Sequence, residues 1–222
     1  MEDAYLICTD SAGRKSYMPL DKDYMKKVSG GYTLNLNSSK TIKIKVKSST
    51  SSGTYVASEE KAAVKWVVKK KIMKPLNSKE FRPTVACTKG EVFEYIYKAN
   101  GAPRTGFKGI KNWFVDLKST DSYYYAVFWA KKKGYIDYGQ FSGEQVFTRG
   151  QALYYVWLSV GSPKAKKATT FNDFRKEVYY AKAVAWAQEK KIYTDTGDHK
   201  FGGDDHLITR GEMARLIYYA YK

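Results

Sequence analysis

The chain has 222 residues, with 39 lysines and arginines against 22 acidic residues, which gives a net charge of +17. A hydrophobic fraction of 43%, with 20 tyrosines and 5 tryptophans, excludes a disordered chain. The sequence has no apolar run of about 18 residues and no signal-peptide pattern at its N-terminus, so neither a membrane span nor a signal peptide is predicted. The basic residues are spread along the chain, which favours an anionic partner but does not select among nucleic acid, lipid and acidic glycan.

Residues 1–54 have the pattern of β-strands. Tyr32–Leu36 and Thr41–Lys47 alternate apolar and polar residues on either side of a polar turn, which is typical of a hairpin. Tyr5–Thr9 is a further candidate strand, and Ser48–Gly53 is a Ser/Thr-rich stretch that predicts a linker. We therefore expect a small N-terminal β segment.

The rest of the chain repeats one pattern three times. Each copy contains the sequence A-V-x-W, at Ala63–Trp66, Ala126–Trp129 and Ala183–Trp186. Each copy later contains the element T-[KR]-G-[EQ], at Thr88–Glu91, Thr148–Gln151 and Thr209–Glu212. We call this element the box. It predicts a capping box, in which the threonine hydroxyl and the Glu or Gln side chain accept backbone N–H groups at the start of a helix.

Each copy is thus expected to be a first helix around the tryptophan, a loop, and a capped second helix over 92–99, 152–158 or 213–221. Such short helices are marginal alone, so they must pack together. Gly101–Pro103 and Gly161–Pro163 carry the Gly-then-Pro signal that follows a helix, which places unit boundaries near 101 and 161. We predict a mainly α fold, with units at 55–101, 102–161 and 162–222.

Two cysteines, Cys8 and Cys87, are too few for a disulfide framework. Because a free cysteine packs like a small hydrophobic residue, we expect a buried thiol at each position. A single bridge between them is the alternative.

These motifs resemble the S-layer homology repeats of bacterial surface proteins. In the third copy, Phe171–Asp173 and Ile208–Glu212 are similar to the family's F-x-D opening and I-T-R-A-E signature, and the second copy is similar at Phe114–Asp116 and Phe147–Gln151. The first copy lacks the F-x-D opening and has Lys89 where the family usually has arginine. The resemblance implies a pseudo-threefold assembly of three repeats around a central helix bundle. It also implies a cell-surface, wall-associated protein that binds pyruvylated secondary cell-wall polysaccharide in the grooves between repeats.

The box places a cation, Lys89, Arg149 or Arg210, in the first turn of each second helix. A cation there opposes the helix dipole, which favours anions, and such local conflicts are typical of functional sites. Arginine binds carboxylates through two parallel hydrogen bonds, so we expect these cations to contact an acidic sugar. The alternative is that they pair with Asp116 or Asp173 and stabilise the fold.

The remaining residues that we assign to carbohydrate binding are Asp116, Asp173, Gly150, Gly211, Tyr124 and Tyr180. A glycine in a helix costs up to about 1 kcal/mol relative to alanine, so the box glycines indicate close approach of a ligand or, as we favour, of a neighbouring helix. The three repeated tryptophans could stack on sugars, but their place in an apolar stripe favours the core.

The sequence offers no support for catalysis. The loop 195–206 gathers four carboxylates and both histidines, but it lacks the spacing of an EF-hand and has no counterpart in the other copies, so we expect a solvated turn. No Ser-His-Asp, Cys-His or paired-carboxylate spacing is present, so we predict no enzyme, cofactor or metal.

Two alternatives to wall anchoring stay open. One is a scaffold with degenerate grooves that binds other surface-protein domains, because 71–75 and 191–195 depart from the family's G-I-x-x-G stretch. The other is nucleic-acid binding, which the absence of a recognised motif disfavours.

Overall fold

The computed structural model describes five strands within residues 5–44, and residues 58–75, 80–105, 107, 110–195 and 197–222. The strands are β1 (Tyr5–Thr9), β2 (Lys15–Pro19), β3 (Met25–Val28), β4 (Gly31–Asn35) and β5 (Thr41–Ile44). β1 pairs with β2, and β3, β4 and β5 form a second antiparallel sheet in chain order. The expected linker Ser48–Gly53 lies outside the described residues.

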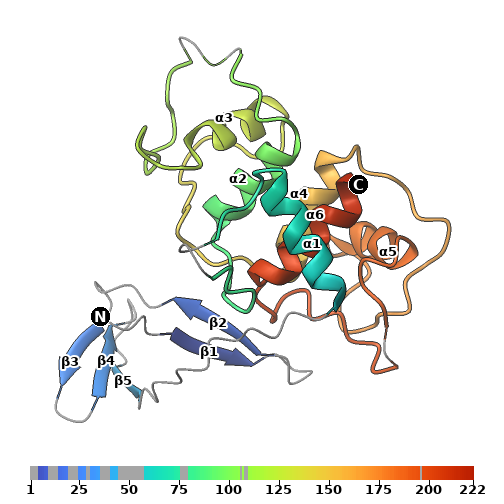
Figure 1. The fold of residues 1–222 in the computed structure, drawn as a ribbon, viewed down its shortest axis with the longest axis horizontal. Coiled ribbons are helices and arrows are strands. Elements are labelled where there is room, and N and C mark those ends of the chain that lie inside the picture. Colours follow the sequence, from blue (N-terminus) through green and yellow to red (C-terminus); the bar gives the residue numbers. More distant parts are fainter. Residues whose placement is uncertain are drawn as a thin grey trace.

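Six helices make the described part of the chain mainly α, as predicted (Figure 1). The tryptophan-bearing helices are α1 (Ser58–Lys69), α3 (Tyr124–Lys132) and α5 (Ala181–Glu189). The box-bearing helices are α2 (Lys89–Ala99), α4 (Arg149–Ser159) and α6 (Arg210–Tyr221). None of these six helices has the length and apolar character needed to cross a membrane.

The predicted capping boxes are confirmed at all three positions. Thr88, Thr148 and Thr209 each accept the N–H of the third residue along, and the Glu or Gln at that position accepts the threonine N–H. Because the capped turn already contains the box residues, α2, α4 and α6 begin about three residues earlier than apolar periodicity alone predicts.

The first helices end in a shared backbone motif. After α1, Lys71 N–H donates to Val68 and Ile72 N–H donates to Val67, both at 2.9 Å. The same two bonds close α3 and α5, and the left-handed residue in the motif is Lys71, Gly134 or Lys191, with φ of 58°, 72° and 58°. This is the Schellman end that usually carries glycine. The departures from glycine that the sequence shows in copies one and three therefore leave the backbone conformation unchanged.

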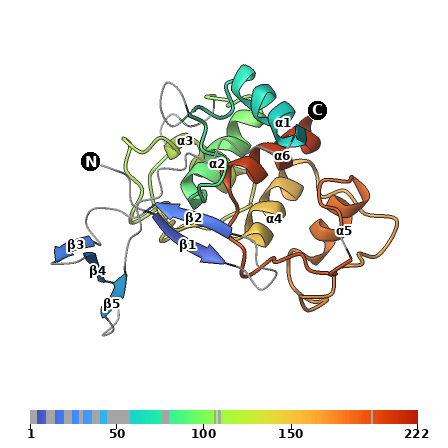
Figure 2. The same ribbon diagram turned by 60° about the horizontal axis from the view of Figure 1, so that its bottom comes forward.

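The box helices lie against one another, and each tryptophan helix packs on one of them. α2, α4 and α6 make mutual contacts, while α3 packs on α2, α5 on α4 and α1 on α6. In both views α1 lies beside α6, and α3 and α5 lie on opposite sides of the helical part (Figures 1 and 2). The first described helix is thus held by the last.

A closed ring of three backbone hydrogen bonds links the segments that precede the boxes. Cys87 N–H donates to Ile208, Ile208 N–H donates to Phe147, and Phe147 N–H donates to Cys87, at 2.9, 2.9 and 3.0 Å. Cys87 is a fully buried free thiol, as expected, and burial raises its pKa. The side chain of Cys8 lies outside the described part of the structure.

The core is continuous across the predicted unit boundaries. Phe93 of α2 contacts Phe141 and Phe147 at ring-centroid distances of 5.4 and 6.3 Å. Burying one such side chain contributes roughly 1.5–3 kcal/mol. Trp129 and Trp186 are each only 4% exposed, so the core prediction is confirmed for them, and the half-buried Trp66 packs against Tyr218 of α6.

Candidate functional site

The candidate site is built around the three boxes, and its backbone donors are already used. Gly90 N–H donates to Gly143, Gly150 N–H to Gly203 and Gly211 N–H to Pro83, at 2.8, 2.8 and 2.7 Å. The preceding cation residues donate in the same way, to carbonyls of Gln145, His206 and Val85. Each helix start is therefore bound to the loop before another box. A ligand at these turns would have to be held by side chains instead of free N–H groups.

Arg149 lies in a buried network with a carboxylate of the third box. It is 4% exposed, and its guanidinium donates to the carboxylate of Glu212 and to the carbonyl of Phe201. His206 Nε2 lies 2.9 Å from both Glu212 oxygens. Burial by itself would raise the pKa of Glu212, but Arg149 and His206 hold that pKa at about 2. Glu212 is thus ionised and bound from both sides.

Arg210 is still more enclosed. It is 1% exposed and donates to the carbonyls of Phe81 and Lys74, to the Tyr95 hydroxyl at 2.7 Å and to Glu91 at 3.3 Å. Because all three guanidinium nitrogens have protein acceptors, Arg210 has little capacity left for an outside carboxylate.

Lys89 differs from both arginines. It is half-buried, and its ammonium lies 4.6 Å from the centroid of the Phe141 ring. Burial lowers its pKa, and the nearby Asp116 opposes that shift. Arg149 and Arg210 each reach the glutamate of another box, and Gln151 is the neutral counterpart of those glutamates. Within the described part of the chain, no carboxylate forms a direct ion pair with Lys89.

The predicted aspartates bind backbone amides of their own copies. Asp116 accepts from Phe141 and Ser142 at 2.7 and 2.6 Å, and Asp173 accepts from Phe201 and Gly202 at 2.8 and 2.6 Å. These bonds hold the loop that carries each phenylalanine. The negative charge of Asp116 acts on Lys89, but the two side chains form no direct ion pair among the described residues, so the pairing alternative is met only in this weaker form.

The box glycines lie against other parts of the chain. A Cβ on Gly150 would come within 2.7 Å of the Tyr180 ring and 2.8 Å of the Gly203 carbonyl oxygen. On Gly211 it would come within 3.0 Å of the Pro83 side chain and 3.2 Å of Glu60. The close approach that these glycines indicated is thus present, but it comes mainly from a tyrosine and from loops, and not from the neighbouring helix that we favoured.

Tyr123, which sequence reasoning missed, has the environment of Tyr180. Its ring fills the space where Gly90 and Gly143 would carry a Cβ, and its hydroxyl donates to Glu144 at 2.9 Å. Tyr123 and Tyr180 both lie three residues before the alanine of A-V-x-W, so alignment on that motif would have identified the pair. The half-buried Tyr124, which we assigned, is one residue further along.

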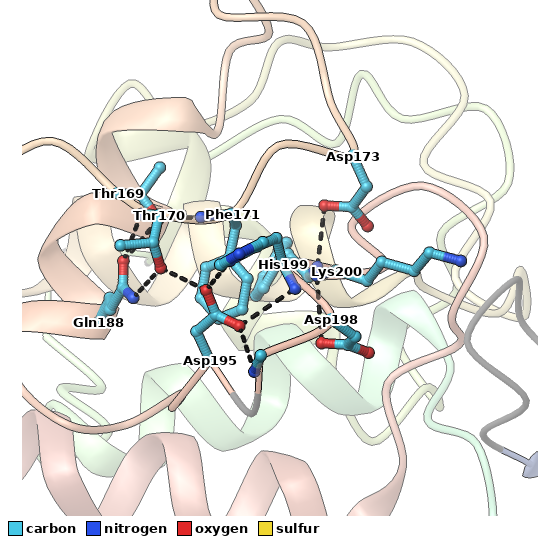
Figure 3. Close-up of polar contacts among 11 residues, drawn as sticks. Thr169, Thr170, Phe171, Asp173, Gln188, Asp195, Asp198, His199 and Lys200 are labelled. Carbon is cyan, nitrogen blue, oxygen red and sulfur yellow. Dashed lines mark hydrogen bonds and ion pairs between the residues drawn. The ribbon is translucent and has the colours of Figure 1, made fainter.

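The part of the 195–206 loop that carries His199 is a network of side chains and backbone amides (Figure 3). Asp195 accepts from the Thr170 hydroxyl, from the N–H groups of Gly197 and His199, and lies 2.6 Å from His199 Nδ1. These contacts, first the Thr170 hydrogen bond, lower the pKa of Asp195 below its usual range. Among the described residues, no group of three or more His, Cys, Asp or Glu side chains is arranged to hold a metal.

In the sequence, Glu91 and Glu212 are recognisable only as caps. Their second role, as partners of Arg210 and Arg149, depends on contacts between copies that no local pattern contains. The sequence contains one sign of this second role. Two of the three boxes carry both a cation and a glutamate, whereas Thr148–Gln151 carries only the cation.

Comparison with protein families identifies one segment of the chain. The model of the S-layer homology domain matches residues 56–93, which include α1 and the first box. The match covers the copy whose motifs are the least similar to the family pattern, and copies two and three stay a prediction. A search of curated proteins returned no match. S-layer homology domains are cell-wall binding modules and not a catalytic family.

Proposed function

We propose that this chain anchors a surface protein non-covalently to the bacterial cell wall, by binding an anionic, pyruvylated secondary cell-wall polysaccharide. The observation that carries the proposal is the S-layer homology domain at residues 56–93, because such domains mediate cell-wall anchoring in general. The net charge of +17 supports it, since a basic surface concentrates an acidic polymer.

The binding unit in this proposal is an assembly of three repeats, 55–101, 102–161 and 162–222, with pseudo-threefold symmetry. Three sets of contacts support it, namely the ring of bonds among Cys87, Phe147 and Ile208, the cyclic bonds from the box glycines, and the packing of each tryptophan helix on a box helix. Residues 1–54 form a separate segment in this scheme. Several grooves on one chain would raise retention on a polymer through effective concentration.

Lys89 is the box cation that we assign to ligand contact. It is half-buried, whereas Arg149 and Arg210 are 4% and 1% exposed and donate to protein carboxylates and carbonyls. Removing a buried arginine from its partner carboxylate would cost about 3–5 kcal/mol, so a ligand would not readily displace Glu212 or Glu91. In this assignment Arg149 and Arg210, together with Gly150, Gly211, Asp173 and Tyr180, shape the walls between repeats. Asp116, whose charge acts on Lys89, is assigned to the ligand side of this box, and Tyr124 is kept as a proposed contact.

Sedimentation with purified cell-wall sacculi tests this function. Lys89→Ala is expected to reduce the co-sedimenting fraction several-fold, whereas Lys164→Ala, which removes an exposed lysine beyond the C-terminal end of α4, is expected to bind like the wild type. Arg149→Ala combined with Arg210→Ala is expected to lower the melting temperature, because both arginines hold the fold and do not contact the ligand in this assignment. Equal binding to sacculi stripped of their secondary polysaccharide, or tighter binding to duplex DNA at two salt concentrations, would reject the proposal.

A further inference from the structure

A cavity of about 370 Å³ lies at the C-terminal ends of α2 and α3, away from the boxes. The box is at the opposite end of α2, and the 12 residue-to-residue steps from Thr88 to the C-cap Asn100 correspond to roughly 18 Å of helix. The cavity is therefore distinct from the turn that carries Lys89. Its volume is at the low end of the range of about 300–1,000 Å³ that is typical of small-molecule sites.

The apolar wall of the cavity is formed by Trp129, Phe107 and Pro103. Trp129 is 4% exposed, and its ring contacts Tyr97 and Tyr135 at centroid distances of 5.9 and 5.6 Å. Its orientation is thus held by neighbours on two sides. A wall that is rigid before binding costs little to order when a ligand arrives.

The polar lining of the cavity consists of two basic and two neutral residues. Lys132 and Lys133 are exposed, and Asn100 and Thr105 complete the polar groups. None of the described residues that line the cavity is acidic. The preceding Lys131 pairs with Asp137 at 2.7 Å, whereas no described carboxylate forms an ion pair with Lys132 or Lys133.

Two hydrogen bonds from the side-chain nitrogen of Asn100 fix its position and leave its amide oxygen available as an acceptor. Its amide nitrogen donates to the Ile96 carbonyl at 2.8 Å and to the Tyr221 hydroxyl at 2.7 Å. Because both N–H donors are used, the amide oxygen is the atom that can accept a hydrogen bond from a ligand hydroxyl.

We infer that this cavity binds one carboxylate-bearing sugar unit. The carboxylate pairs with Lys132 and Lys133, a hydroxyl donates to Asn100, and the C–H face of the ring lies on the apolar wall. The ligand class rests on the proposed function, since a second site for an acidic sugar would let the chain grip the wall polymer at a point remote from Lys89.

Titration of the ¹⁵N-labelled full chain with methyl β-D-glucuronide, followed at the indole N–H of Trp129 and the side-chain amide of Asn100, tests the inference. We expect saturable shifts, and at least about tenfold weaker binding of the neutral methyl β-D-glucoside, which corresponds to about 1.4 kcal/mol. Lys132→Ala with Lys133→Ala is expected to lose the response. Lys182→Ala with Lys190→Ala, which removes one exposed lysine of α5 and the exposed lysine at its C-cap, is expected to keep it.

Lys89→Ala separates this inference from wall anchoring. The variant is expected to retain the glucuronide response at Trp129 while binding sacculi poorly. An absent response at Trp129 in a chain that still binds sacculi would overturn the second site and leave anchoring intact. Equal responses to glucuronide and glucoside, or an unchanged response in the Lys132 and Lys133 variant, would also overturn it.

Discussion

At the scale of single residues, the box cations form two different kinds of contact. Arg149 and Arg210 donate to Glu212 and Glu91 in buried positions, where desolvation consumes much of the Coulomb attraction. The intact pair can add little net stability, but the loss of one partner is strongly destabilising because it leaves a buried charge unpaired. Among the described residues, Lys89 has no such glutamate partner, and this contrast underlies its assignment to the ligand.

The acid sensitivity of the Glu212 carboxylate is a direct consequence. Its folded-state pKa of about 2 is below the ordinary value of 4.5, so the stabilisation is fully present above about pH 4.5 and is lost as the pH falls toward about 2. A shift of this size corresponds to about 3 kcal/mol. We expect Glu212→Gln, which keeps a capping box like that of Gln151, to lower the free energy of unfolding by about this amount at pH 7.

Urea denaturation at pH 7, 4.5 and 3 measures this effect. The difference between wild type and Glu212→Gln should shrink as the pH falls, and the exposed control Glu177→Gln should differ little from wild type at any pH. A difference of constant size across the three pH values would show that the ion pair is not its source.

At the scale of elements, the same local chemistry recurs at each helix end. Capping boxes begin α2, α4 and α6, and Schellman ends close α1, α3 and α5. Two of those ends place a lysine, Lys71 or Lys191, in the left-handed region where Gly134 stands in the second copy. A residue with a Cβ costs roughly 1–2 kcal/mol there.

Lys191→Gly should therefore stabilise the protein. The relief of the left-handed strain exceeds the extra entropy that glycine brings to the unfolded chain, so we expect a net gain of about 0.5–1 kcal/mol. The adjacent Lys190→Gly is the matched control, because the C-cap Lys190 has φ −77° and gains nothing from glycine. Thermal melts of both variants measure the result, and stabilisation by Lys190→Gly or destabilisation by Lys191→Gly would contradict it.

At the scale of the whole molecule, the ends of the helical part are tied together. α1 packs on α6, Arg210 of α6 reaches Phe81 and Lys74, and Tyr221 bonds to Asn100 at the end of α2. Elements that are far apart in sequence thus share one core, to which all three copies contribute side chains.

Removing α6 should consequently unfold more than the last copy. For a chain truncated after Asp205 we expect loss of the near-ultraviolet dichroism and of the cooperative thermal transition for the whole helical part, because α1, α2 and α4 each lose a packing partner. The full chain, measured in parallel, should show one transition. A retained sigmoidal transition in the truncated chain would indicate copies that fold independently.

The sequence by itself determined the local features of this protein. The capping boxes, the mainly α character, the buried Cys87 and the core positions of Trp129 and Trp186 follow from residues within a few positions of one another, because helix caps and apolar stripes are set by i to i+4 interactions. Only the tertiary structure decided the environment of the box cations. Arg149 meets Glu212 and Arg210 meets Glu91 across separations of 63 and 119 residues, and such contacts exist only once the copies pack. The half-buried Lys89 is thus a candidate for ligand contact, whereas the buried Arg149 and Arg210 bind other parts of the chain. Their desolvation depends on every element that covers the side chain.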